Sequence, residues 1–219
     1  MGQVIAIDGP AGAGKSTIAR RLATRLGYTY IDTGAMYRSV ALAATRGGLS
    51  LSDQAGLEQL ARSIQIELVP PNLVRLNGED VTEAIRSADV TVGASIVAAV
   101  PGVRRAMVDI QRRVARGASV VMEGRDIGTV VFPDASVKVF LDADSTERAR
   151  RRASERPEIP SRQLAAQIAE RDARDRSRAH SPLVPAADAY HLDSTGLTLQ
   201  EVEDKILQLV YSTRTVNEV

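Results

Sequence analysis

The chain contains no cysteine and no tryptophan, and only two of its 219 residues are histidine. Without cysteine there is no disulfide, no thiolate zinc site and no cysteine nucleophile. The two histidines, His180 and His191, cannot build a multi-histidine metal site without several carboxylates. These absences exclude thiol enzymes and most structural zinc proteins.

Long apolar runs and an excess of one charge are also absent. No segment approaches the roughly 18 consecutive apolar residues of a membrane-spanning helix, and the N-terminus lacks a basic region and a cleavage site. Lys and Arg number 28 against 27 Asp and Glu, so no uniform basic field indicates duplex nucleic acid or an anionic membrane. We expect a cytoplasmic protein that binds neither membrane nor nucleic acid.

Lysine is scarce, since Lys15, Lys138 and Lys205 are the three lysines and the other 25 basic residues are arginine. Planar guanidinium groups suit the recognition of phosphate and carboxylate. A GC-rich genome would produce the same bias, and for the composition as a whole we favour that explanation. The positions of individual arginines are more informative than their number.

Five short apolar segments alternate with helical patterns, which predicts a parallel, doubly wound α/β sheet flanked by helices. Apolar residues at spacing four follow the first segment, and the final helix opens at a capping box, Thr198 to Glu201. The five predicted strands are residues 3–7, 28–31, 119–122, 137–141 and 189–192.

Two segments interrupt this alternation. Residues 64–76 contain two alternating apolar and polar runs, which predict a small antiparallel hairpin. Residues 147–178 hold ten Arg and six Asp or Glu and are broken by two prolines, which predicts a pair of charged helices with a hinge. We therefore predict a core of residues 1–61, 104–145 and 179–219, an insertion of 62–103, and a lid of 146–178.

Residues 9–16 match the phosphate-binding pattern G-x-x-x-x-G-K-[ST]. Its glycines let backbone N–H groups face phosphate oxygens, while Lys15 reaches the β- and γ-phosphates and the Ser16 hydroxyl ligates Mg²⁺. We expect Lys15 to lie on a surface loop, with no role in the core. The predicted ATP site comprises Gly9, Pro10, Ala11, Gly12, Ala13, Gly14, Lys15, Ser16 and Thr17.

Polar clusters follow the second and third predicted strands, at the sheet edge where open α/β folds bind ligands. Residues 32–38 place Thr33 and Arg38 there, and residues 123–126 add Arg125 and a carboxylate. An alternative is that Thr33 caps the following helix and Arg38 is solvated. The two clusters are candidates for binding the phosphate acceptor.

One face of the charged segment changes from apolar to ionic along its length. This face could be a solvated helix end, with surface pairs Glu170–Arg174 and Asp172–Arg176. It could also present cations to a bound polyphosphate, and the glycine loop favours this second interpretation. The residues that share the face, at steps of four and three, are Leu164, Ile168, Arg171, Asp175 and Arg178.

Together these motifs resemble the bacterial cytidylate kinase family of the nucleoside monophosphate kinases. The resemblance is carried, in the expected order and over nearly the whole chain, by residues 7–16, 32–38, 123–134 and 171–178. It implies a P-loop kinase with a five-stranded parallel sheet, an inserted monophosphate-binding domain and a short lid. It also implies Mg²⁺-dependent phosphoryl transfer from ATP to CMP or dCMP.

The resemblance further implies residue roles, with Lys15, Arg125, Arg171 and Arg178 as the catalytic cations. Thr33, Arg38 and Arg125 would hold the acceptor phosphate. Ser95, Arg104 and Asp126 would read cytosine, although Ser95 and Arg104 lie outside any tight motif. Arg171 and Asp175 would lie near the ribose, and Arg178 would bridge toward phosphate.

Other functions compete with this one. A P-loop kinase could act on another small acceptor, such as UMP, shikimate or gluconate. A GTP switch normally carries an N-K-x-D motif, and Asn77-Gly-Glu-Asp80 lacks its lysine. A nucleic-acid-binding P-loop protein would use the arginine-rich segment, which has no interleaved aromatic residue. We therefore expect a monomer whose partners are the small molecules ATP, CMP and dCMP.

Overall fold

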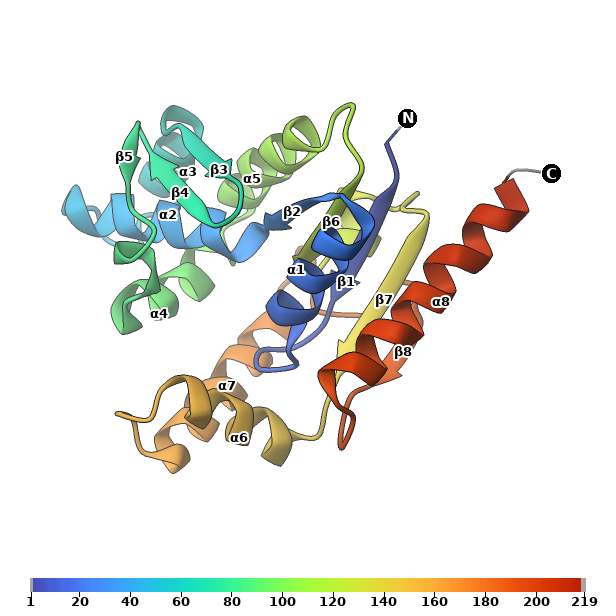
Figure 1. Ribbon diagram of the computed structural model, residues 1–219. Helices are drawn as coiled ribbons and strands as arrows, with labels where there is room; N and C mark the ends of the chain where they lie inside the picture. Colours follow the sequence, from blue (N-terminus) through green and yellow to red (C-terminus); the bar gives the residue numbers. More distant parts are fainter. Residues whose placement is uncertain (1, 218–219) are drawn as a thin grey trace. The chain divides into compact units, whose positions relative to one another are not determined.

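The computed structural model describes residues 2–217 and the side chains of residues 2–213. The chain, whose helices and strands are labelled in Figure 1, forms two compact units. Each unit has its own apolar core. The first unit combines Met1–Tyr30 with Gly117–Val219, and the second comprises Ile31–Arg116. The predicted insertion, residues 62–103, lies within the second unit, and its boundaries stay a prediction.

The main sheet has five strands in the order β2-β6-β1-β7-β8. β1 pairs with β6 and β7, and β7 pairs with β8, all in parallel. Each predicted strand lies on an observed one, so the predicted five-stranded α/β sheet is confirmed. The strands are β1 (Val4–Asp8), β2 (Thr29–Asp32), β6 (Val120–Gly124), β7 (Val137–Asp142) and β8 (Tyr190–Asp193).

Helices α1 (Lys15–Leu26) and α8 (Leu199–Asn217) pack against this sheet, and in Figure 1 α8 (red) runs beside β7. Apolar residues at spacing four on α1, among them Ile18 and Leu22, are buried against strand residues of β1 and β7. The predicted capping box of α8 is confirmed, because Glu201 N donates to Thr198 Oγ1 at 3.2 Å and Thr198 N to Glu201 Oε2 at 2.8 Å.

The arginine-rich segment forms two helices, α6 (Ser145–Glu155) and α7 (Ser161–Arg176), as predicted. A five-residue π-helical turn, η2 (Ile127–Val131), follows β6 and was not predicted. Its defining bond runs from Val131 N to Asp126 O at 3.2 Å. Short π-helical turns are rare in proteins, and those that occur are often found at functional sites.

The second unit carries the predicted hairpin, formed by β3 (Ile66–Val69) and β4 (Leu73–Leu76), with β5 (Glu79–Asp80) added at its edge. Its core includes Met36, Leu57 and Met107, all fully buried. Two further elements, α3 (Gln54–Ser63) and the 3₁₀ turn η1 (Ala84–Arg86), were not predicted. The remaining helices of this unit are α2 (Thr33–Arg46), α4 (Ala88–Val97) and α5 (Pro101–Val114).

Within residues 2–217, no single helix has both the length and the apolar character needed to cross a bilayer. Helices α4 and α5 reach that length and composition only when they are counted together across a 100° bend.

Candidate active site

The glycine loop joins β1 to α1 and leaves the start of α1 open to a ligand. Gly14, at the N-cap, has φ 91° and, lacking a side chain, cannot cap the first turn of α1. Gly9 has φ 148°, and a Cβ there would lie 1.9 Å from the carbonyl oxygen of Leu141 on β7. Glycine at these positions therefore permits a turn whose N–H groups, together with the helix dipole, form an anion-binding site.

Lys15 is the first residue of α1, and its side chain is buried rather than exposed. The expectation of a surface position is therefore wrong. Its Nζ donates to the Pro10 carbonyl oxygen at 2.6 Å, inside the loop. Burial, together with the cations of Arg125 and Arg171, lowers the Lys15 pKa to about 7 against the opposing charges of Glu123 and Asp8. An anion bound in the loop would favour the charged ammonium.

Ser16 is held by a carboxylate from the neighbouring strand. Its hydroxyl donates to Glu123 Oε2 at 2.9 Å, and the Tyr30 hydroxyl donates to Glu123 Oε1. Glu123 lies on β6, next to β1, and is buried. The hydroxyl and carboxylate oxygens are hard donors, which suit Mg²⁺. Sequence reasoning assigned a metal role to Ser16 alone and missed Glu123, although the latter ends a buried strand beside the loop.

Three arginines converge on one buried carboxylate, Asp175 of α7, which is 1% exposed. Arg125 Nε lies 2.8 Å from Asp175 Oδ2, Arg178 donates to Asp175 Oδ1, and Arg171 Nε lies 3.9 Å from Oδ2. Burial alone would raise the pKa of Asp175, but the three guanidinium groups hold it below its ordinary value. The predicted residues Arg125, Arg171, Asp175 and Arg178 are thus brought together, and the ionic face of α7 is not a solvated helix end.

Asp126 is buried and precedes the π-helical turn η2. The start of that turn is fixed by Asp8 at the end of β1, whose two carboxylate oxygens accept Ile127 N and Gly128 N, each at 2.8 Å. Burial raises the pKa of Asp8 to about 6 in spite of these two bonds. Asp8 escaped the sequence analysis because its partners lie about 120 residues away.

In the second unit, Asp32 rather than Thr33 caps helix α2. Its side chain accepts Ala35 N at 2.9 Å and pairs with Arg38 Nη2 at 2.8 Å. Thr33 is buried as the first residue of α2, and the Arg38 side chain is 17% exposed. The alternative in which Thr33 is the cap and Arg38 is solvated is therefore wrong.

Ser95 and Arg104 are both buried in this unit, on α4 and α5 respectively. Arg104 Nη1 donates to the Ala98 carbonyl oxygen at 3.2 Å, and its guanidinium lies 5.5 Å from the centre of the Tyr37 ring. Burial and these two contacts fix the position of the Arg104 guanidinium. The assignment of both residues to cytosine stays a prediction.

The structure also corrects the expected surface pair between Asp172 and Arg176. Asp172 is 2% exposed, accepts Ala11 N at 3.0 Å and pairs with Arg148, which is buried on α6. The other expected pair, Glu170–Arg174, is present on the surface of α7. No local pattern reveals the contact of Asp172 with the glycine loop, since the partners are 161 residues apart.

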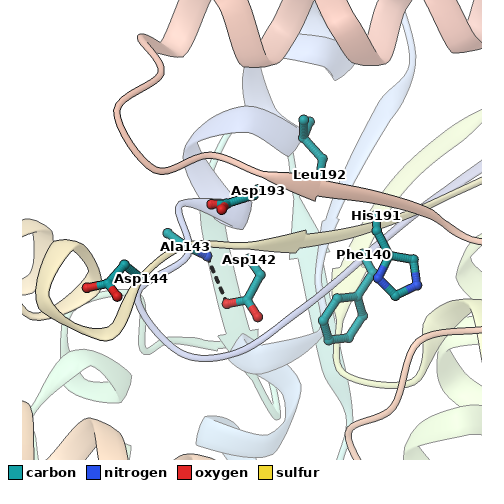
Figure 2. A pocket seen from close by; sticks show the side chains of 7 residues that line it. All are labelled: Phe140, Asp142, Ala143, Asp144, His191, Leu192 and Asp193. Atoms are coloured by element: carbon teal, nitrogen blue, oxygen red, sulfur yellow. Dashed lines mark hydrogen bonds between the residues drawn. The ribbon is translucent and has the colours of Figure 1, made fainter.

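A cavity of about 340 Å³ lies at the ends of β7 and β8 (Figure 2). Figure 2 shows the carboxylates of Asp142, Asp144 and Asp193 around it, with the rings of Phe140 and His191 at one side. Ala143 and Leu192 complete the lining, so no residue of the glycine loop contributes to it. We assign the chemistry to the glycine loop, where the cations gather, and not to this acidic cavity.

Comparison with known proteins agrees with this geometry. The model of the cytidylate kinase family matches residues 5–212. The cytidylate kinase of Solibacter usitatus is 59% identical over 215 residues, which cover 95% of this chain and 92% of that protein. The cytidylate kinase of Pelotomaculum thermopropionicum is 52% identical over 218 residues, covering 96% of each.

Among solved structures, a gluconokinase from Sinorhizobium meliloti aligns with a TM-score of 0.53 at 14% sequence identity, covering 99% of this chain and 95% of that one. A likeness at this identity concerns the fold alone. The family match and the two relatives extend far beyond the glycine loop that all such kinases share. The chain therefore belongs to the cytidylate kinase family.

Proposed function

We propose that this chain transfers the γ-phosphoryl group of ATP to CMP, giving CDP and ADP, and that dCMP is a second acceptor. The observation that carries the proposal is the buried Lys15 at the uncapped start of α1, in a chain of the cytidylate kinase family. A lysine buried at a helix N-terminus favours the binding of an anion, and the polyphosphate of ATP supplies one.

The donor phosphates would lie on the N–H groups of the glycine loop and the first turn of α1. Lys15 would contact the β- and γ-phosphates from inside the loop. Mg²⁺ would be held by the Ser16 hydroxyl with Glu123 behind it, and when bound it neutralises charge on the phosphate oxygens. Glu123 keeps the Ser16 hydroxyl oriented, and Tyr30 in turn fixes the Glu123 carboxylate.

The attacking group would be an oxygen of the CMP phosphate, which is already ionised at neutral pH. No side chain is therefore needed as a general base, in agreement with the absence of histidine from every motif. Arg38, Arg125 and Thr33 would hold that phosphate in line with the donor. Lys15, Arg171 and Arg178 would stabilise the charge that spreads over the transferred group.

Cytosine would be read by Asp126, Ser95 and Arg104. The exocyclic amine of cytosine is a donor and suits a carboxylate, whereas uracil presents a carbonyl at the same position. Arg171 and Asp175 would lie beside the ribose. The substrates are free nucleotides, and we infer that the chain acts on them as a monomer in the cytoplasm.

A kinase for UMP, shikimate or gluconate is the competing function, and a comparison of acceptors decides between them. We expect turnover on CMP and dCMP to exceed that on UMP, AMP, shikimate and gluconate in a coupled assay for ADP. Comparable turnover on shikimate or gluconate would contradict the proposal. Tight single-strand binding with steep salt dependence would instead favour the nucleic-acid-binding alternative.

Lys15→Ala should lower kcat by well over the factor of ten that about 1.4 kcal/mol represents, because the charge next to the transferred phosphate is removed. Lys205→Ala, which changes an exposed lysine of α8, is the matched control and should retain full activity. Thermal melting is needed for both variants, since Lys15 is buried. A folded Lys15→Ala enzyme with more than about a tenth of the original kcat would exclude the role of Lys15.

Arg38→Ala should raise KM for CMP about tenfold or more while KM for ATP stays nearly constant, because a bond to a charged group contributes roughly 1.5–3 kcal/mol. Arg46→Ala is the control on the same helix, since Arg46 forms an exposed pair with Glu79. Initial rates at varied concentrations of each substrate give both constants. Equal increases in the two KM values would remove Arg38 from the acceptor site.

Asp126→Asn should narrow the ratio of kcat/KM for CMP to that for UMP by about tenfold or more, because an amide can donate to uracil as well as accept from cytosine. Asp134→Asn, a change at an exposed position eight residues further along the chain, is the control. The ratio is measured with both acceptors under identical conditions. If it does not change in the folded Asp126→Asn enzyme, Asp126 does not read the base.

A further inference from the structure

Side chains from α6 and α7 form hydrogen bonds with both peptide groups of Ala11 in the glycine loop. Asp172 Oδ1 accepts Ala11 N at 3.0 Å, and Arg148 Nη1 donates to Ala11 O at 2.9 Å. The two side chains also pair with each other, and both are buried, with exposures of 7% for Arg148 and 2% for Asp172. We call this arrangement of Arg148, Asp172 and Ala11 the Ala11 clamp.

The clamp is anchored on its far side as well. Arg148 Nε donates to the Ala143 carbonyl oxygen at 3.0 Å, at the end of β7. A Cβ on Gly12 would lie 3.0 Å from the Arg148 carbonyl oxygen, so the backbone of α6 itself closes against the loop. Arg151, one turn further along α6, donates to Ala13 O at 3.2 Å and to Ser194 Oγ at 2.9 Å. Two arginines of α6 therefore donate hydrogen bonds to two carbonyl oxygens of the loop.

Burying the Asp172 carboxylate beside a phosphate-binding loop is energetically unfavourable, and stability of the fold alone does not explain it. A buried carboxylate next to a phosphate-binding loop repels phosphate unless a cation compensates it, and a buried ion pair generally stabilises a fold no better than apolar residues would. Asp172 is compensated by Arg148, and its remaining oxygen is occupied by the Ala11 N–H. The pair thus fixes the direction of the Ala11 peptides without adding net charge to the phosphate site.

We propose that Arg148 and Asp172 are positioning residues for the phosphate donor: they hold the glycine loop at Ala11 in the shape that directs its other N–H groups at the ATP phosphates. The inference rests on the proposed ATP site at this loop. It also follows that both ends of the arginine-rich segment are tied to the loop, one through α6 and one through α7. Any movement of this segment would have to occur between the two anchors.

Asp172→Ala is the central test. It should raise KM for ATP, and the Kd for ADP measured by calorimetry, by about tenfold or more, and change KM for CMP by less than about twofold. Asp172→Asn keeps an acceptor for Ala11 N–H, so its KM for ATP and Kd for ADP should lie between those of Asp172→Ala and the parent. In the same way, Arg148→Lys keeps the charge, and its two constants should lie between those of Arg148→Met and the parent. Graded recovery of donor binding is not expected from a residue that only stabilises the fold.

Two controls use exposed ion pairs on the same helices. Arg152→Met on α6 and Glu170→Gln on α7 each break a surface pair and should leave both KM values within about twofold of the parent. The double variant Arg148→Met/Asp172→Asn should have a KM for ATP no higher than that of the more impaired single variant. The reason is that neither charge of the pair stays buried without its partner.

The proposal is overturned if a folded Asp172→Ala enzyme binds ADP like the parent, or if its KM values for ATP and CMP rise together. If Asp172→Ala does not fold, Arg148→Met, which removes both the pair and the bond to Ala11 O, decides by the same two constants. Turnover of the unaltered chain on CMP tests the proposed function separately, so the two failures are distinguishable.

Discussion

Burial and the guanidinium groups of Arg125 and Arg171 lower the pKa of the Lys15 ammonium to about 7. Glu123 and Asp175 compensate part of this positive charge. The fold thus concentrates like charges that repel one another until an anion arrives. Polyphosphate relieves this repulsion, and a transferring phosphoryl group needs the same cations. The electrostatic strain of the ligand-free site is therefore what prepares it for phosphate.

The rest of the first unit holds these charges in place. Parallel strands end at one edge of the sheet, where Asp8 and Glu123 from β1 and β6 meet the glycine loop. Asp8 fixes the π-helical turn that follows Asp126, and Asp175 orients Arg125 from α7. Each of these carboxylates is buried and bonded to a specific partner, so the cations do not move apart to relieve their repulsion. Rigidity of this kind lowers the reorganisation needed when phosphate binds.

Local patterns in the sequence predicted the elements that depend on neighbours in the chain. The five strands, the hairpin and the capping box of α8 follow from apolar spacing and turn residues, and all are present. Lys15, Asp172 and the π-helical turn could not be predicted correctly, because their environments are made by residues far away in the sequence. Asp172 illustrates the reason: the spacing rule favoured a surface pair with Arg176, whereas burial against Ala11 and Arg148 is a tertiary contact. The roles of Ser95 and Arg104 came from family resemblance and not from any local signal.

Titration of Lys15 tests most directly whether the positive charge of the site prepares it for phosphate. Isotope-labelled lysine makes this titration measurable, because the chain has three lysines, Lys15, Lys138 and Lys205. NMR of the side-chain nuclei, with Lys15→Ala to assign the signal, gives the pKa with and without ADP. We predict a Lys15 pKa near 7 in the ligand-free protein and a clearly higher value with ADP bound, because phosphate favours the ammonium form. A Lys15 that titrates at the ordinary lysine value of 10.5 in both states would contradict it.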